Sequence, residues 1–260
     1  MYRLRFNTIE QLFNIPPGVE AVLPASDILK YFDERDDLRK LAHDSLLIAE
    51  IPSVIWEGSV DGIKKILVSL KDLGVCDVLC ENIGGFEFCE ELGLKAHGGM
   101  YLNVLNVPAL KEYDKLGAED VTLSFEMPFN KQRAFLGAVS KESDIDAKLG
   151  IVIYGYLPLM KFRACPAMGK DGCKGCTRDK YLKDRKGEKF RILCHGSKYS
   201  ELLNCVPLYA ADKTLPSFDF YTAYFTVESK EECEEIFRMI EAHEIPEFRH
   251  TSGLYKRELL

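Results

Sequence analysis

The sequence predicts an α/β fold, a TIM-like (β/α) barrel formed by one domain over residues 1–260. Short runs rich in Val, Ile and Leu are nearly continuous in apolar residues, as in strands that are buried on both faces. Stretches of helical period alternate with these runs, which fits a doubly wound sheet or a closed barrel. A chain of 260 residues with 47% hydrophobic content can bury one large core. About eight strands are expected, and that number favours the barrel.

The expected elements follow one another in a regular order. Strands are expected at 2–6, 21–24, 46–51, 77–80, 95–98, 121–124, 150–154 and 218–225. Helices are expected at 26–43, 59–73, 107–116, 130–139 and 229–243. Gly74 and Gly117 end two of these helices, Asn106 is the expected N-cap of another, and Ile83-Gly84-Gly85 is interpreted only as a turn.

The chain carries no sign of a membrane or secretory segment. It has no run of about 18 consecutive apolar residues, and its first residues, MYRLRFNTIEQLF, lack the order of a secretory signal. We therefore expect a cytoplasmic protein, in which disulfides are rare and cysteines bind metal, catalyse or lie buried. The sequence also lacks a P-loop, a dinucleotide-binding fingerprint and the motifs of zinc peptidases and serine hydrolases.

Polar residues follow several predicted strands, where the active site of such a barrel lies. They are Glu50, Glu81, Asn82, His97, Asn103, Asn106 and Glu126. Any one of them can instead be a helix cap or a loop residue that hydrogen-bonds the backbone. Glu126, between a buried strand and Pro128, is the strongest catalytic candidate in this set.

Residues 156–212 form a cysteine-rich, basic insertion between the last two predicted strands. Its candidate metal ligands are Cys165, Cys173, Cys176 and Cys194. The spacing of these cysteines is typical of metal ligands, and Gly172 and Gly175 allow the tight backbone that a Cys-x-x-Cys loop needs. The other five cysteines lie in apolar surroundings and are expected to be buried: Cys76, Cys80, Cys89, Cys205 and Cys233. Of these, Cys205 remains a spare candidate ligand.

Cysteine spacing alone leaves the metal open. Four thiolates fit an iron–sulfur cluster, whose negative charge the surrounding Lys and Arg residues would offset, and they also fit a closed structural zinc site. Unligated thiols are the third alternative, although this polar loop would then lack a source of order. A nucleophilic cysteine is disfavoured, because His195 directly follows Cys194 and adjacent residues of a strand face opposite sides.

Charge is distributed unevenly along the chain. The net charge of −7 argues against binding of nucleic acid over the whole surface. Residues 161–198, in contrast, contain twelve Lys or Arg residues against four acids, a net charge of +8. This segment is either a solvated charged loop or faces something anionic, such as a cluster or a phosphate-bearing substrate.

In order, the motifs of the insertion resemble those of a known family. They are Gly155-Tyr-x-Pro-Leu-Met160, Arg163, Cys165, Gly172-Cys173-x-x-Cys176, Asp184-Arg185-x-Gly187, Phe190, Cys194, Glu201-Leu-Leu-Asn204 and Pro207-Leu-Tyr. Upstream stand Asn103-Val-x-Asn106 and Val121-Thr-Leu-Ser-x-Glu126, and Thr251-Ser-Gly-Leu-Tyr closes the chain. Together these motifs resemble the collagenase-like peptidase family, peptidase U-32.

The resemblance implies a cofactor and a reaction. Similar members carry a four-cysteine 4Fe–4S cluster and take part in hydroxylating tRNA, ribosomal RNA or ubiquinone precursors. By motif, the ligands here would be Cys165, Cys173, Cys176 and Cys194. The first hypothesis is therefore an enzyme with an iron–sulfur cluster, or alternatively zinc, that acts on RNA or on a small aromatic or isoprenoid substrate.

In this hypothesis the candidate catalytic residues are Glu126, His97 and Arg163. The second hypothesis is a collagenase-like peptidase, and the third is a non-catalytic, metal-stabilised domain that binds an anionic partner. Longer members of the family have additional sequence before or after the barrel. This chain is therefore expected to be either a stand-alone short form or an excised domain, and in the second case a partner domain or subunit lies outside it.

Overall fold

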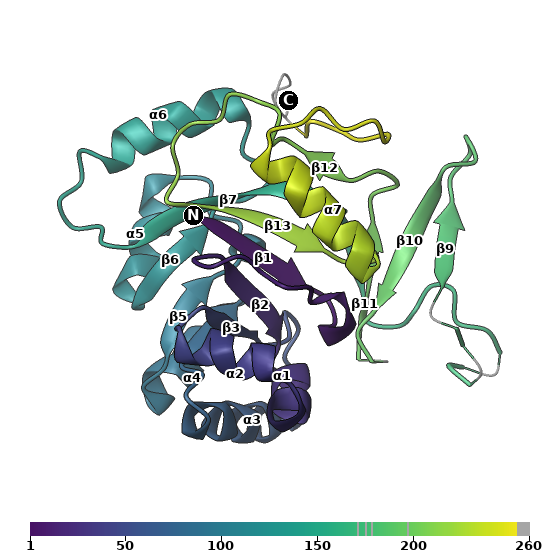
Figure 1. Ribbon diagram of the computed structural model, residues 1–260, viewed down its shortest axis with the longest axis horizontal. Coiled ribbons are helices and arrows are strands. Elements are labelled where there is room, and N and C mark those ends of the chain that lie inside the picture. Colours follow the sequence, from purple (N-terminus) through teal and green to yellow (C-terminus); the bar gives the residue numbers. More distant parts are fainter. Residues whose placement is uncertain (171, 175, 178, 197, 254–260) are drawn as a thin grey trace.

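Eight parallel strands form a closed barrel in the computed structural model, which describes residues 1–253 apart from 171, 175, 178 and 197 (Figure 1). They are β1 (Tyr2–Phe6), β2 (Glu20–Pro24), β3 (Leu47–Glu50), β4 (Asp77–Cys80), β5 (Lys95–Gly98), β6 (Ala118–Thr122), β7 (Lys148–Gly155) and β13 (Phe220–Phe225). Each strand pairs with the next one in this order, and β13 pairs with both β7 and β1, which closes the barrel. The predicted TIM-like barrel is confirmed. Gly175 and the last two residues of the Thr251-Ser-Gly-Leu-Tyr motif lie outside the described residues.

Helices follow most of the strands and cover the outside of the barrel (Figure 1). They are α1 (Ala25–Tyr31), α2 (Asp36–His43), α3 (Val60–Asp72), α4 (Gly84–Leu92), α5 (Val107–Lys115), α6 (Phe129–Val139) and α7 (Lys230–Glu241). Short 3-10 helices lie at η1 (Ile9–Gln11), η2 (Phe32–Glu34), η3 (Glu57–Ser59) and η4 (Met100–Leu102). Asn106 caps α5 as predicted, since its side-chain oxygen accepts the N–H of Ala109 at 2.9 Å. No helix among the described residues is long and apolar enough to cross a bilayer.

Several local predictions were wrong. The single helix expected at 26–43 is divided into α1, η2 and α2. The Gly84-Gly85 pair begins helix α4 instead of forming only a turn, because a Cβ at Gly85 would lie 2.9 Å from Cys80 and Ile51 and only glycine lets the helix approach β4 so closely. Cys76 and Cys205 are only half-buried, since both lie in loops, whereas Cys80, Cys89 and Cys233 are buried as expected.

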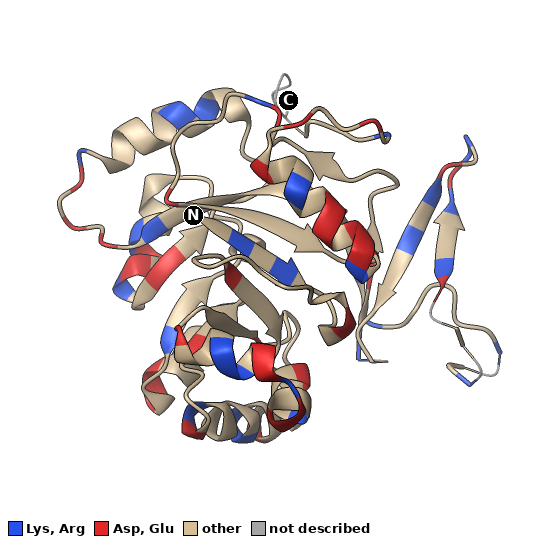
Figure 2. Cartoon of the chain, viewed as in Figure 1, with Lys and Arg blue, Asp and Glu red and all other residues tan. Residues whose placement is uncertain are grey.

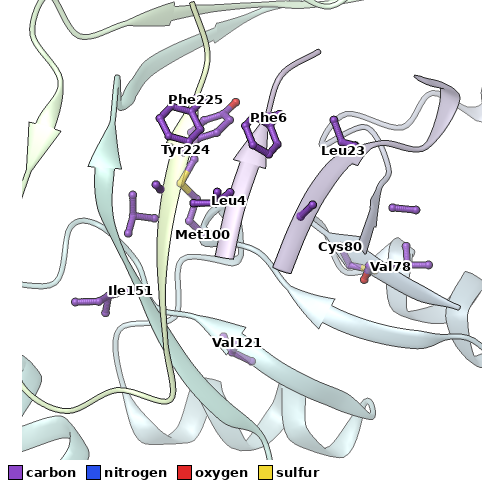
Figure 3. Close-up of a cluster of buried hydrophobic side chains, with 14 of the residues drawn as sticks. Leu4, Phe6, Leu23, Val78, Cys80, Met100, Val121, Ile151, Tyr224 and Phe225 are labelled. Atoms are coloured by element: carbon purple, nitrogen blue, oxygen red, sulfur yellow. Dashed lines mark hydrogen bonds between the residues drawn. The ribbon is translucent and has the colours of Figure 1, made fainter. Parts of the chain in front are cut away.

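Alternate residues of β1 face opposite sides of the barrel wall. Leu4 and Phe6 belong to the core between strands and helices, where Phe6 stacks on Phe225 with ring centroids 5.4 Å apart (Figure 3). Arg3 and Arg5 face the interior and are 1% and 4% exposed. There they line a small internal space with Val22, Leu79, Thr122, Val152, Thr222 and Tyr224. Strand β1 therefore places two buried arginines inside the barrel.

A second, antiparallel sheet lies between β7 and β13 in the sequence. Its strands are β8 (Pro158–Phe162), β9 (Lys180–Lys183), β10 (Lys189–Cys194) and β11 (Ser200–Leu203), in the spatial order β8-β11-β10-β9. The short strand β12 (Leu208–Tyr209) then pairs antiparallel with β7. Figure 1 shows β9 and β10 as a hairpin beside the barrel, and Figure 2 shows Lys and Arg residues along both strands. Because this sheet follows the last residue of β7, it starts at the carboxyl end of the barrel.

Candidate active site

Arg5 joins two carboxylates at the carboxyl end of the barrel. Its Nε and Nη2 atoms donate to the two oxygens of Glu50 at 2.9 and 2.7 Å, and its Nη1 donates to Glu81. Glu50 ends β3 and Glu81 follows β4, so two of the strand-end residues meet on one cation. Glu81 also accepts the N–H of Tyr101 at 2.8 Å. Burial raises the pKa of Glu81, and the charge of Arg5 offsets this only in part.

Glu201 of β11 connects the insertion to this layer. Its carboxyl is 2% exposed and accepts the hydroxyl of Tyr101 at 2.8 Å, while Nε2 of His195 lies 3.1 Å from its second oxygen. The Nζ atom of Lys161 is 3.4 Å away. Burial raises the pKa of Glu201, but His195, Lys161 and Tyr101 together lower it to about 2. Glu201 is therefore ionised at neutral pH.

A cavity of about 630 Å³ lies between the barrel mouth and the insertion. The barrel contributes Glu50 and Tyr224, the end of β10 contributes Cys194, and the turn between β10 and β11 contributes His195 and Tyr199. The rings of His195 and Tyr199 stack with centroids 4.3 Å apart. Apolar side chains line much of the rest: Pro24, Ala25, Ile51, Pro52, Ile63, Ile66, Ile192, Leu193 and Val227. Its size and mixed lining are typical of a small-molecule site.

Glu126 lines a second, smaller cavity of about 240 Å³. Tyr101 and Lys161 also line it, together with apolar side chains of Met100, Phe125, Pro158, Leu159 and Met160. The Glu126 side chain is exposed, and its N–H donates to the hydroxyl of Ser124 at 3.2 Å. Glu126 is therefore placed at the barrel mouth, beside the residues that contact Glu201.

His97 lies deeper in the barrel, in a layer that contains Arg3. Its Nδ1 is 2.6 Å from Asp120 and its Nε2 is 3.0 Å from Asp77, and Asp120 also accepts both Nη groups of Arg3 at 2.9 and 2.7 Å. Burial lowers the pKa of His97, but the two carboxylates outweigh it and raise the pKa to about 9. His97 therefore carries a charge that its neighbours neutralise, and it lines neither of the two cavities at the mouth.

Arg163 follows β8 on the surface. Its guanidinium lies 4.9 Å from the ring centre of Trp56, which is itself exposed. Among the described residues, no hydrogen bond or ion pair joins Arg163, His97 and Glu126 to one another. The structure therefore does not assemble these three predicted catalytic residues into one constellation.

The four candidate metal ligands lie in two segments of the insertion. Cys194 is the last residue of β10, and the other three lie in the loop between β8 and β9. Cys165 and Cys194 are half-buried, and Cys173 and Cys176 are exposed. Within the part of the chain that the structure describes, three or more His, Cys, Asp or Glu side chains are nowhere grouped as a metal would require. The ligand set stays a prediction.

The chemistry of this donor set fits the predicted metal centre. Four thiols can supply every ligand of a 4Fe–4S cluster or of a tetrahedral zinc site. Cys194 lines the large cavity, and so does Thr177, the residue after Cys176. Both segments that carry the cysteines therefore reach the wall of the same cavity.

Sequence reasoning missed several residues at the barrel mouth. Arg5, Tyr101, Lys161, Glu201 and Tyr199 were not predicted as functional residues. The strand YRLRF contained a signal for the first of them, because two arginines with one residue between them share a face of a strand. Glu201 opens the Glu201-Leu-Leu-Asn204 motif, but no local pattern shows the partners of these residues, which come from distant parts of the chain: Glu201 is 100 residues from Tyr101.

Comparison with known proteins supports the fold. No protein-family model and no curated protein matches this chain. Among solved structures, the U32 peptidase Mk0906 has a TM-score of 0.54 and 13% identity, over 88% of this chain and 94% of that one. The CutC protein from Streptococcus agalactiae has a TM-score of 0.43 and 12% identity, over 58% of this chain and 87% of that one.

The likeness to Mk0906 concerns the course of the chain, since few residues are identical. It covers most of both chains and therefore includes the barrel. The resemblance to peptidase U-32 that the sequence motifs indicate is confirmed at the level of the fold. This chain has the barrel fold of the U32 peptidase Mk0906.

Proposed function

We propose that the chain is a barrel enzyme of the peptidase U-32 family whose active centre is the large cavity at the barrel mouth. Cys165, Cys173, Cys176 and Cys194 would hold a metal centre at the edge of this cavity. A 4Fe–4S cluster is the first candidate for this centre, and zinc is the alternative.

One observation carries this proposal. The two segments that contain the cysteines both line the cavity, through Cys194 and through Thr177 next to Cys176. A metal centre held by these thiols would therefore lie beside the space where a substrate binds. When bound, a 4Fe–4S cluster supplies electron transfer, whereas zinc supplies a structural cross-link or a Lewis acid.

The cavity favours a substrate with a flat or apolar body. The stacked rings of His195 and Tyr199 form one wall, and the carboxyl group of Glu50, which accepts hydrogen bonds from Arg5, lies at the barrel side. Arg191 and Lys198 add positive charge to the lining. These groups support the expectation of a small aromatic or isoprenoid compound, or of a base of an RNA strand whose phosphates meet the cations.

The proposed reaction is hydroxylation of that substrate, as the motif resemblance implies, with dioxygen and an added reductant as co-reactants: one oxygen atom enters the substrate, and two electrons from the reductant reduce the other to water. Glu50, His195 and Tyr199 can orient the substrate by hydrogen bonds and stacking, because they line the cavity on opposite sides. Catalytic roles for Glu126, His97 and Arg163 stay predictions, and so does a partner domain or subunit outside this chain.

The test uses protein purified without oxygen and given a reductant, with and without dioxygen. One set of reactions contains total tRNA and ribosomal RNA, and the other contains small phenols and isoprenoid-substituted rings. Mass spectrometry should find a product that has gained one oxygen atom. Cys194→Ser should abolish the product, and Cys205→Ser, a half-buried cysteine outside the predicted ligand set, should not.

Two other results would reject this reaction. Cleavage of gelatin that is lost on substitution of residues at the barrel mouth, without any product that has gained oxygen, would establish the peptidase activity that the name of Mk0906 suggests in place of hydroxylation. Salt-sensitive RNA binding without chemical change would establish a binding domain.

A further inference from the structure

Ser53 and Lys161 form a contact that the proposed hydroxylation does not use. The Nζ atom of Lys161 lies 2.7 Å from Oγ of Ser53, although the two residues are 108 positions apart. We propose that Ser53 and Lys161 are a nucleophile and its general base, and that they cleave acyl substrates, namely esters or amides. Serine–lysine pairs can do the work of a serine–histidine pair when nucleophile and base are within hydrogen-bond reach.

Ser53 is held in place by the barrel. It lies in the loop after β3, and its carbonyl accepts the side-chain N–H of Asn82, the second residue after β4, at 3.1 Å. Its Oγ also lies 3.2 Å from the hydroxyl of Tyr199 on the insertion. A serine hydroxyl can rotate, so it can donate to Lys161 when that amine is neutral.

Lys161 is oriented by two further groups. Its Nζ lies 3.3 Å from the ring centre of Tyr101 and 3.4 Å from Glu201. Glu201 is itself fixed by Tyr101 and His195, so it acts on the reaction only through Lys161 and is a positioning residue. This arrangement has the three parts that an activated nucleophile needs: the nucleophile, the base, and a group that holds the base.

The environment of Lys161 also favours its neutral form. Burial lowers the pKa of Lys161, and the nearby charge of Arg5 acts in the same direction. Glu201 and Glu81 oppose this shift, but the resulting pKa still lies below that of an ordinary lysine. A larger fraction of the amine is therefore available as a base near neutral pH.

The pair lies between the two cavities at the barrel mouth. Tyr199, whose hydroxyl contacts Ser53, and Pro52, which precedes Ser53 in the sequence, both line the large cavity. Lys161 and Tyr101 line the small one, whose wall is mainly apolar. A substrate that occupied both cavities would carry its cleavable bond past Ser53, with an apolar group in the smaller space.

Ser53, Lys161 and one water molecule account for every proton moved and every bond formed or broken in the reaction. Oγ of Ser53 gives its proton to neutral Lys161 and bonds to the carbonyl carbon, and the bond from that carbon to the leaving group then breaks. The leaving alcohol or amine takes the proton from Lys161. Water next attacks the acyl-serine, which releases the carboxylic acid and restores the Ser53 hydroxyl.

The test is covalent labelling with a fluorophosphonate probe, followed by intact-mass measurement and peptide mapping. We expect one adduct per chain, located on Ser53, and a labelling rate that rises with pH as Lys161 loses its proton. Lys161→Met should slow labelling at least about 100-fold, as expected for loss of a general base. Lys161→Arg should slow it similarly, because it keeps the charge and removes the base, and thermal melts should show that both variants are folded.

Two matched variants serve as controls. Ser69→Ala removes a serine whose hydroxyl donates to the carbonyl of Lys65, and Lys64→Met removes a lysine that also lies over an aromatic ring, Phe88, and pairs with Glu91. Both should label like the wild type. Labelling should be the same before and after treatment with a metal chelator, so that this result is independent of the metal centre.

Two outcomes would overturn the proposal. One is folded wild-type protein that remains unlabelled at Ser53. The other is labelling at Ser53 that proceeds equally fast in folded Lys161→Met and Lys161→Arg proteins.

Discussion

The hydroxyl of Tyr101 donates a hydrogen bond of 2.8 Å to Glu201, and this contact fixes the insertion on the barrel mouth. Tyr101 follows β5 in the barrel, and Glu201 lies in β11 of the second sheet. The backbone N–H of Tyr101 meanwhile donates to Glu81, which contacts Arg5 inside the barrel. One residue therefore connects the buried charges of the barrel with the sheet that covers the large cavity.

Removing the hydroxyl should loosen the insertion. In Tyr101→Phe the buried carboxylate of Glu201 loses one hydrogen bond, which should cost about 1–3 kcal/mol of unfolding free energy. Hydrogen exchange should rise in β11 more than in β1. Tyr113→Phe is the control, because the Tyr113 hydroxyl lies as far as 3.5 Å from its acceptor, the carbonyl of Leu102, and this hydrogen bond is weak. Equal exchange in β11 of Tyr101→Phe and wild type would show that the contact does not fix the sheet.

The free energy of unfolding should depend strongly on Arg5, because this cation pairs with two carboxylates of the barrel. Arg5→Met leaves Glu50 and Glu81 close together without their cation, and loss of one partner of such a buried pair costs about 3–5 kcal/mol. Urea unfolding measures this loss. Arg238→Ala, which removes an exposed arginine that pairs with Glu235 and Glu244, should leave the midpoint unchanged. Similar losses of unfolding free energy in Arg5→Met and Arg238→Ala would contradict a stabilising role for the ion pairs of Arg5 with Glu50 and Glu81.

His97 should make the protein less stable at high pH. Its pKa is raised from 6.5 to about 9 in the folded protein, so the folded state binds the proton more tightly than the unfolded chain. The resulting stabilisation is complete below about pH 6.5 and is lost as the pH rises through about 9. Urea unfolding at a series of pH values measures it.

The matching variant is His97→Gln, in which this part of the pH dependence should disappear. His43→Gln, which removes an exposed histidine, should keep the slope of the wild type. If wild type and His97→Gln lose stability in parallel over this pH range, the ion pairs of His97 contribute nothing.

Glycine is required where the chain passes Glu81. A Cβ at Gly99 would lie 2.2 Å from the carboxyl of Glu81, which is buried and held by Arg5. Gly99→Ala should therefore destabilise the protein by about 1–3 kcal/mol or more. Gly137→Ala in α6 has open space around it and should stabilise the helix by about 0.5–1 kcal/mol. Thermal melts of the two variants should shift in opposite directions.

The eight strands of the barrel could be predicted from the local sequence pattern, whereas β8, β9, β10, β11 and β12 of the insertion were not predicted. β1, β4 and β5 have the predicted bounds. α4 was missed because its first residues are glycines, and their purpose, a close approach to Cys80, is visible only in three dimensions. β6 begins at Ala118, earlier than predicted, because Asp120 is a charged strand residue that pairs with Arg3 inside the barrel.

The site was less predictable than the fold. Glu50, Glu81 and Glu126 could be named because polar residues after barrel strands meet at one end. Tyr101, Lys161 and Glu201 could not, because only folding of the insertion over the barrel brings them together. His97 looked like a site residue from its position after an apolar run, but the sequence does not show that Asp77 and Asp120 flank it.

The metal content of protein purified without oxygen tests the central claim most directly. We predict about four iron and four sulfide atoms per chain, with the visible absorbance of a 4Fe–4S cluster. Cys165→Ser, Cys173→Ser, Cys176→Ser and Cys194→Ser should each lower the iron content, and Cys205→Ser should leave it unchanged. One zinc per chain that depends on the same four cysteines would select the alternative metal. Folded protein that binds neither metal, or binds it equally well in the four variants, would contradict the claim that these cysteines hold a metal centre at the barrel mouth.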